Sequence, residues 1–334
     1  MHRPEAHPGP TLAVGEATED WTGDAVFYEY SQAADPIGSG AISPVPVRRF
    51  SPSLHAGGPS RIVPLDLSTE LGVDGPATSP ALLASFVVIE PGERLVTEPD
   101  ASSELYYCLR GAGHSEFERA VPSGGRGSDR IDWRRGDFLT LPAGCTAAHV
   151  AHGADSGALL YRVTDAPLLR YLGVVPSSSR FEPTRFDGAH ALARLAEVER
   201  DPGASDRSRV SILLANTATP RTLTVTHTLW AMLGVLPAGR VQRPHRHQSV
   251  ALDLITECGP GCYSLIGSRV DPAGTIIDPV RVDWEPAGAF VTPPGLWHSH
   301  HNESGRPAYL VPVQDAGLHT YLRSLDIRFG PAGN

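Results

Sequence analysis

An internal repeat constrains the fold of this chain more than any other feature. Ile131-Asp132-Trp133 in the first half is matched by Val282-Asp283-Trp284 in the second half, and Pro142-Ala143-Gly144 is matched by Pro293-Pro294-Gly295. Weaker matches join Val88-Ile89 to Val235-Leu236, and Asp165-Ala166 to Asp315-Ala316. The copies lie about 150 residues apart, which is the size of a domain and exceeds the about 20–50 residues of a solenoid unit. The sequence therefore predicts a duplicated domain.

Short apolar runs bounded by Gly and Pro predict that each copy is built from β-strands. The runs are residues 84–90, 104–109 and 138–141 in the first copy, and 223–236, 250–256, 263–266 and 289–292 in the second. The chain of 334 residues has 34 Gly and 31 Pro, which suits many short strands joined by turns. This pattern predicts an all-β sandwich or barrel in each half.

The predicted organisation has four parts. They are an N-terminal arm (1–45), a first barrel (46–175), a linker with a short helix (176–210) and a second barrel (211–334). In the linker, Asp187 is a plausible N-cap, apolar residues at 192, 195 and 198 lie on one helical face, and Asp201-Pro202-Gly203 ends the helix. Residues 168–172 and 318–322 can form short helices that close each barrel.

Composition excludes several classes of function. The formal net charge is −9, all 28 basic residues are Arg, and no basic run or stripe occurs, so nucleic-acid binding is not expected. No apolar run approaches the about 20 residues of a membrane span, and the N-terminus lacks the pattern of a signal peptide. Four Cys in 334 residues do not form a disulfide framework. We therefore expect free thiols and a cytoplasmic location.

Two histidine-containing segments of the second copy predict a metal site. The first is Pro244-His245-Arg246-His247, and the second runs from Pro293 to His298 and is followed by Asn302. Residues two apart on a strand point to the same face, so His245 and His247 can share a cavity that His298 enters from another strand. A His-x-His alone is often a surface feature, but the second segment, in the correct order and spacing, favours a metal site. Three neutral imidazoles suit Fe, Zn, Cu or Ni.

The first copy lacks these histidines. Glu98 and Asp100 stand at the positions of the first two, and Ala147 stands at the position of His298. With Glu104 nearby, two or three carboxylates could hold a hard cation such as Mg²⁺ or Ca²⁺. The simpler interpretation, which we favour, is a degenerate barrel that keeps the fold without a metal.

The paired segments resemble the two motifs of the cupin superfamily, and the duplication resembles a bicupin. The second copy is similar to the group that contains gentisate 1,2-dioxygenase, salicylate dioxygenase and 1-hydroxy-2-naphthoate dioxygenase. The matching residues are Pro244 to His247, Ala251-Leu252, Thr292-Pro293 and Trp297-His298-Ser299-His300. The resemblance implies two duplicated cupin barrels (double-stranded β-helix, or jelly-roll) with short connecting helices. It also implies non-haem Fe(II) held by His245, His247 and His298.

Two features depart from the pattern of this group. Ala287 stands where the second motif usually begins with Gly. The intact triad lies in the C-terminal barrel, whereas gentisate enzymes of this type usually keep their iron in the N-terminal one. The resemblance is therefore more specific for the fold than for the substrate.

Residues around the triad have candidate roles. His300 shares the strand face of His298 and is predicted to act as a catalytic acid or base. Trp297 either walls a substrate pocket or belongs to the core, and Asn302 holds either a turn or a ligand. Arg162 and Arg243 are candidates for binding an anionic substrate.

The leading hypothesis is an Fe(II)-dependent dioxygenase that cleaves a small hydroxylated aromatic carboxylic acid, gentisate-like, with O₂ as the second substrate. Neutral ligands leave the iron its full positive charge, which an anionic chelating substrate would offset. The alternatives are an isomerase, lyase or hydrolase that uses Zn, Mn or Ni in the same cage, and a non-catalytic bicupin that binds a ligand. Because cupin barrels often pair, a homo-oligomer is a further prediction.

Overall fold

The computed structural model describes residues 21–98, 100–120, 126–153, 157–203 and 210–330. The chain divides into two compact units, Met1–Ile42 and Ser43–Asn334. The described part of the first unit contains helix α1 (Tyr30–Ala33), whose N-terminus is capped by the Glu29 carboxylate, which accepts from Ser31 N at 3.0 Å. Residues 1–20 of the predicted arm lie outside the described residues.

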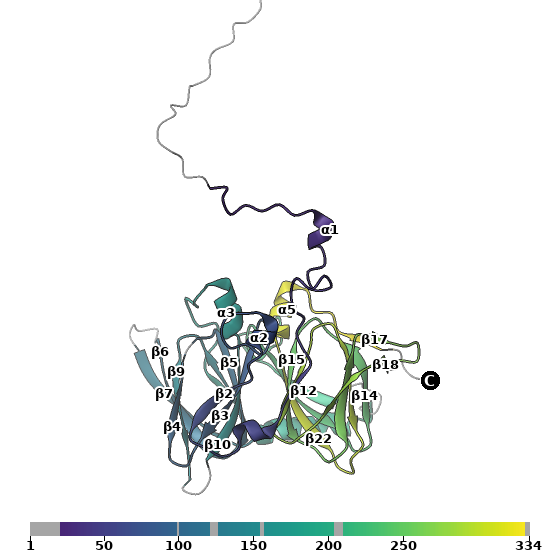
Figure 1. The fold of residues 1–334 in the computed structure, drawn as a ribbon. Helices are drawn as coiled ribbons and strands as arrows, with labels where there is room; N and C mark the ends of the chain where they lie inside the picture. Colours follow the sequence, from purple (N-terminus) through teal and green to yellow (C-terminus); the bar gives the residue numbers. More distant parts are fainter. Residues whose placement is uncertain (1–20, 99, 121–125, 154–156, 204–209, 331–334) are drawn as a thin grey trace, which may run out of the picture. The chain divides into compact units, whose positions relative to one another are not determined.

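The second unit contains two barrels of antiparallel strands (Figure 1). The strands of the first barrel are β2 (Arg61–Pro64), β3 (Leu83–Ile89), β4 (Arg94–Thr97), β5 (Ser103–Arg110), β6 (Ala112–Ala120), β7 (Arg126–Arg134), β8 (Phe138–Pro142), β9 (Thr146–Ala151), β10 (Ala158–Thr164) and β11 (Thr184–Phe186). They form a six-stranded sheet in the order β11-β8-β5-β10-β3-β2 and a four-stranded sheet in the order β4-β9-β6-β7.

The second barrel repeats this plan. Its strands are β1 (Arg48–Phe50), β12 (Val210–Leu214), β13 (Trp230–Leu236), β14 (Val241–Arg246), β15 (Ala251–Glu257), β16 (Cys262–Gly267), β19 (Val280–Asp283), β20 (Ala289–Thr292), β21 (Trp297–Asn302), β22 (Ala308–Gln314) and β23 (Arg328–Phe329), with a hairpin of β17 (Arg269–Val270) and β18 (Ile276–Ile277). The six-stranded sheet has the order β1-β20-β15-β22-β13-β12, and the five-stranded sheet has the order β19-β16-β21-β14-β23. The predicted all-β fold of duplicated cupin barrels is confirmed.

Apolar side chains form three layers, one inside each barrel and one between the barrels. In β15, Leu252 and Leu254 belong to the layer between the barrels, whereas Ile255 belongs to the interior of the second barrel. In β3, Phe86 contributes to the layer between the barrels and Val87 to the interior of the first barrel. Strands buried on both faces read as unbroken apolar runs in the sequence. Each fully buried side chain of this size stabilises the fold by about 1.5–3 kcal/mol, so the barrels are joined by a substantial core.

Two edge strands pair in a way that the four-part division of the sequence does not predict. β1 lies within the residues assigned to the first barrel (46–175), yet it pairs with β20 of the second barrel, with Arg48 opposite Val291. β11 lies in the predicted linker, yet it pairs with β8 of the first barrel, with Phe186 opposite Phe138. The four-part division of the sequence stays a prediction, and these two pairings show where the sheets do not follow it.

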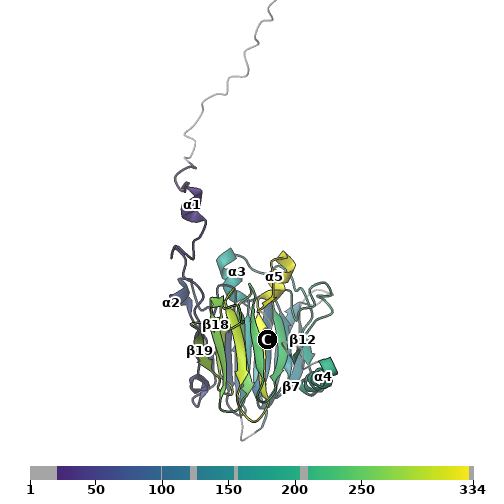
Figure 2. The ribbon, with the colours of Figure 1, turned by 90° about the vertical axis from the view of Figure 1, so that its right-hand side faces the viewer.

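The helices are short and include those expected from the sequence. They are η1 (Pro52–His55), α2 (Ser68–Leu71), α3 (Ala166–Leu172), α4 (Gly188–Arg200) and α5 (Ala316–Leu322). The Asp187 carboxylate caps α4 by accepting from His190 N at 3.0 Å, and Leu195 is buried as predicted, although Leu192 is exposed. α3 and α5 lie at the same end of the two barrels (Figures 1 and 2). Over the described residues, the helices are all too short or too polar to cross a membrane.

Backbone conformation explains two local differences from expectation. The apolar run 223–236 was expected to be one strand, but residues 223–229 form turns and β13 begins at Trp230; Leu223 has φ of 54°. Ala287, which stands where the cupin motif usually has Gly, adopts φ of 63°. This left-handed conformation costs a residue other than Gly about 1–2 kcal/mol. The backbone at Ala287 therefore has the conformation that the motif's usual Gly would adopt more easily.

Candidate metal centre

The structure brings His245, His247 and His298 together inside the second barrel. His245 lies on β14 directly opposite His298 on β21, and His247 follows the end of β14. One ring nitrogen from each lies within 4.8 Å of those of the other two. The centroid of the His298 ring is 4.0 Å from that of His245 and 4.9 Å from that of His247. All three side chains are buried, at 1–3% exposure, so the predicted triad forms a cluster shielded from solvent.

Hydrogen bonds at Nδ1 orient all three rings in the same way. His245 Nδ1 lies 3.1 Å from Arg243 O, and His298 Nδ1 lies 3.1 Å from Leu296 O. His247 Nδ1 lies 2.8 Å from Ser249 O. Since a carbonyl oxygen only accepts, each Nδ1 carries the proton and each Nε2 presents its lone pair. Such outer hydrogen bonds are typical of metal-binding His residues, and three neutral nitrogen donors fit a transition metal better than a hard cation.

A polar pair beside His247 holds its ring in place. Ser249 Oγ lies 3.0 Å from His247 Nδ1 and donates to Gln314 Oε1 at 2.9 Å. Both Ser249 and Gln314 are buried. Sequence reasoning missed both residues, because Gln314 lies on β22 and no motif links it to the histidine segment.

His300 lies beside the triad, as its position on β21 predicted. The centroid of its ring is 5.7 Å from that of His298 and 6.0 Å from that of His245. Its Nδ1 lies 2.7 Å from Ser264 Oγ, and Trp284 Nε1 donates to the same hydroxyl at 2.8 Å. Because Trp only donates, the hydroxyl proton of Ser264 can go to His300 Nδ1, an arrangement that favours a proton on Nε2.

Two further residues contact His245. Gln242 Nε2 lies 3.5 Å from His245 Nε2, and the Phe329 ring stacks on the His245 ring with centroids 6.0 Å apart. The pairing of β14 with β21 shifts register between Gln242 and His245. This irregularity allows residues an odd number apart to share a face, so strict alternation could not have placed Gln242 in the site.

The predicted substrate residues are only partly gathered at the triad. Trp297 is the neighbour of His298 on β21, so its side chain points to the opposite face of the strand. Arg246 Cζ lies over the Trp297 ring, 5.2 Å from its centroid. Asn302 Nδ2 donates to the carbonyl of Leu236 at 2.9 Å, and its Oδ1 accepts from Ser304 N at 3.0 Å. These bonds favour the turn-holding role that was one of its two predicted alternatives.

The two predicted arginines lie in different barrels. Arg243 is on β14, half-buried, and its carbonyl orients His245. Arg162 is on β10 of the first barrel, so it does not join the triad. It is buried there, with Nε donating to Glu104 Oε2 at 3.0 Å and Nη2 lying 3.4 Å from Asp100 Oδ1.

The interior of the first barrel is occupied by this arginine network. The Tyr106 hydroxyl donates to Glu104 Oε2 at 2.5 Å and lies 2.9 Å from Thr97 Oγ1. Burial lowers the pKa of His149 to about 3, which keeps its ring neutral. In the part of the chain that the structure describes, the carboxylates of Glu98, Asp100 and Glu104 form no metal-ligand group of three. Arg162 and Glu104 thus form a buried ion pair inside the first barrel.

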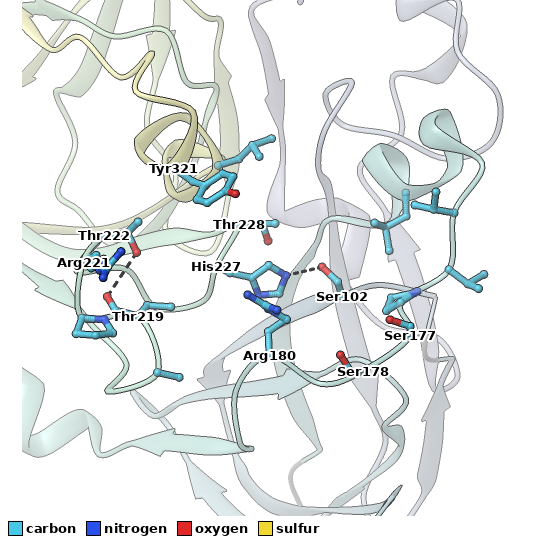
Figure 3. A pocket seen from close by; sticks show the side chains of 17 residues that line it. Ser102, Ser177, Ser178, Arg180, Thr219, Arg221, Thr222, His227, Thr228 and Tyr321 are labelled. Atoms are coloured by element: carbon cyan, nitrogen blue, oxygen red, sulfur yellow. Dashed lines mark hydrogen bonds between the residues drawn. The ribbon is translucent and has the colours of Figure 1, made fainter.

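A cavity of about 780 Å³ lies away from the triad, where residues of both barrels meet (Figure 3). Its polar lining includes Arg180, Arg221 and His227, and His227 Nε2 lies 2.9 Å from Ser102 Oγ. None of the three clustered histidines lines it. The cavity and the metal centre are therefore separate sites.

With two cupin barrels and a buried three-histidine cluster in the second, the chain has the fold of a bicupin. It resembles the salicylate and gentisate 1,2-dioxygenases. No family model matches the chain. Gentisate 1,2 dioxygenase 1 of Aquipseudomonas alcaligenes is 30% identical over 105 residues, which are 31% of this chain. The match spans about a quarter (26%) of the length of that relative.

Solved structures match over a larger share of the chain. A salicylate 1,2-dioxygenase variant from Pseudoaminobacter salicylatoxidans, in complex with gentisate, has a TM-score of 0.61 at 16% identity. The match covers 91% of this chain and 85% of that one. Oxalate decarboxylase of Bacillus subtilis, as a deletion mutant, has a TM-score of 0.51 at 13% identity and covers 81% and 75% of the two chains. At such identities the likeness establishes the bicupin fold.

Proposed function

We propose that the chain is a non-haem Fe(II)-dependent dioxygenase that cleaves the ring of a small hydroxylated aromatic carboxylic acid. The observation that carries this proposal is the convergence of three buried, neutral imidazoles with their Nε2 atoms presented together. The similarity of the fold to a gentisate-bound salicylate dioxygenase supports it. His245, His247 and His298 would hold the metal, and Fe(II) would supply a redox-active Lewis acid with open coordination positions.

The charge of the donor set favours an anionic substrate. The three histidines contribute no negative charge, so they leave the charge of a bound divalent ion uncompensated. A carboxylate with a neighbouring hydroxyl or phenolate oxygen would offset that charge and orient the ring. Arg243 on β14 is a candidate to pair with such a substrate, and Trp297 is a candidate to wall its pocket. Arg162 and Asn302, which are held by protein partners, are weaker candidates.

His300 is proposed to hold and donate a proton beside the metal site. The chain from Trp284 through Ser264 fixes its ring and favours a proton on Nε2. General acid–base assistance by such a group typically contributes about 10²–10⁴-fold to the rate. His300 would thus act on the substrate or on a reacting oxygen without being a metal ligand.

The same three-histidine cage also suits a metal that performs no redox chemistry. Neutral imidazoles bind Zn, Mn or Ni as well as Fe, so an isomerase, lyase or hydrolase is the second candidate, and a ligand-binding bicupin without activity is the third. Cys108, Cys258 and Cys262 are buried thiols, which supports a reducing, cytoplasmic location. A homo-oligomer is a further part of the proposal.

Metal analysis of anaerobically purified full-length protein tests the proposal most simply. We expect iron close to one equivalent per chain. Zinc or nickel at that stoichiometry, with no iron, would favour the non-redox candidate. O₂ uptake with aromatic acids then separates an enzyme from a ligand-binding protein.

A further inference from the structure

A second group of metal-type ligands lies on the outer side of the first barrel. His114 on β6 is paired with Asp132 on the neighbouring strand β7. His152 directly follows β9, the other neighbour of β6, and its N–H donates to Ala112 O at 2.8 Å. One ligand atom from each of the three residues lies within 4.8 Å of those of the other two. Three adjacent strands therefore bring two imidazoles and a carboxylate to one point.

The hydrogen bonds of His114 prepare it as a ligand. Its Nε2 lies 3.2 Å from Glu116 Oε1, and its Nδ1 lies 2.7 Å from His152 Nε2. A carboxylate that accepts from one ring nitrogen fixes the tautomer and leaves the other nitrogen with its lone pair, which is the usual arrangement around zinc-bound histidines. His114 is only 8% exposed, so its ring is held in this orientation by packing.

Asp132 supplies an ionised carboxylate. Arg130 donates from Nε at 3.1 Å and from Nη2 at 2.7 Å, both to Oδ1. These two hydrogen bonds from Arg130 favour the ionised form of the carboxylate. Neither Arg130 bond uses Oδ2, so the carboxylate can reach an ion while it remains paired.

The second barrel shows the same framework without the two histidines. There Tyr263 is opposite Asp283, and Arg281 Nε donates to Asp283 Oδ1 at 2.8 Å, as Arg130 does to Asp132. The Tyr263 hydroxyl donates to Glu303 Oε1 at 2.7 Å. A tyrosine–glutamate hydrogen bond thus occupies the positions of His114 and His152, and the scaffold is stable without nitrogen ligands there.

We propose that His114, Asp132 and His152 bind a divalent transition metal ion, best satisfied by Zn²⁺, at a site separate from the histidine triad. Water completes the tetrahedral shell, because Asp132 and His152 are exposed. At Zn–N distances of about 2.1 Å, two nitrogens of a tetrahedron lie about 3.4 Å apart, so the present 2.7 Å pair opens slightly as the ion enters. The ion clamps β9, β6 and β7 together on the face opposite Trp133, whose Nε1 donates to Ser115 inside the barrel.

The test counts Zn²⁺ sites on metal-stripped full-length protein by titration calorimetry against a competing chelator. The variant combining His114→Tyr with His152→Glu installs the pair found in the second barrel, so it removes the ligands while keeping a hydrogen bond that the fold accepts. We expect two sites per chain in the wild type and one in this variant. His247→Ala, which removes a triad ligand, leaves the surface site in place, and combining all three changes leaves none.

A second variant tests the orienting role of Glu116. Glu116→Gln keeps all three ligands and should weaken Zn²⁺ binding at this site about 10–100-fold without changing its stoichiometry. His190→Ala, on the exposed side of α4, is the matched control and should change neither quantity. The proposal is overturned if the His114→Tyr, His152→Glu variant binds as many Zn²⁺ ions per chain as the wild type.

Discussion

The two barrels carry equivalent aspartates, Asp165 and Asp315, directly after strands β10 and β22. Asp315 follows β22, is only 8% exposed, and accepts from Val250 N at 2.9 Å. Burial raises the pKa of Asp315 far above the usual range of a carboxyl group, to about 7. Because the folded state prefers the neutral acid, ionisation of Asp315 costs stability, and this cost grows as the pH rises from about 4 to about 7.

The size of the effect follows from the difference between the folded and unfolded pKa values. A pKa of about 7 in the folded state and about 3.9 in the unfolded state corresponds to about 4 kcal/mol of lost stability above pH 7, of which about 1.5 kcal/mol is already lost at pH 5. Asp315→Asn removes the titration and keeps an acceptor oxygen for Val250 N. The free energy of unfolding of the variant, relative to wild type, should therefore increase by about 2–3 kcal/mol between pH 5 and pH 8.

Urea unfolding of metal-free protein at both pH values measures this difference. Asp165→Asn is the matched comparison, since the Asp165 carboxylate accepts from the backbone N–H of Ser102 and Ser103 at 2.8 and 3.0 Å and from the Thr228 hydroxyl at 2.9 Å. Loss of that acceptor should destabilise the protein by about 0.5–1.5 kcal/mol for each hydrogen bond weakened. If the advantage of Asp315→Asn did not grow with pH, the argument from burial would be wrong.

The remaining predictions concern the metal centre. His247→Ala should lose most bound iron, measured by elemental analysis, while its far-UV circular dichroism stays unchanged, because the barrel cores do not include this side chain; full iron occupancy would contradict the triad. Converting Glu98 to Gln and Asp100 to Asn together should leave iron content unchanged, and a fall from two equivalents to one would place a metal in the first barrel. His300→Ala should reduce kcat about 10²–10⁴-fold with iron still bound, and an unchanged kcat would exclude an acid–base role.

The duplicated fold and the triad could be predicted because both depend on short-range patterns. Apolar runs between turns marked the strands, and the capping carboxylate of Asp187 marked the start of α4. Two motifs in fixed order were enough to bring His298 opposite His245. These features follow from local spacing, which a single sequence records directly.

Features that depend on long-range pairing could not be predicted. Nothing in the sequence around Arg48–Phe50 indicates that this strand pairs with β20, which lies more than two hundred residues later in the chain. The register shift that brings Gln242 beside His245 depends on how β14 meets β21. The sequence made Arg162 a candidate for binding an anionic substrate. In the structure its guanidinium group is buried and donates to the Glu104 carboxylate instead.

The central claim is that the histidine triad supports oxygen-dependent ring cleavage, and O₂ consumption measured with substrate absorbance tests it most directly. The Fe(II)-loaded protein should be incubated in air with gentisate, salicylate, 1-hydroxy-2-naphthoate and related acids. We expect at least one acid to lose its aromatic absorbance as O₂ is consumed. His298→Ala should abolish both the O₂ consumption and the loss of absorbance. Iron-loaded protein that leaves O₂ untouched across this panel, yet converts a compound without oxygen, would contradict the account.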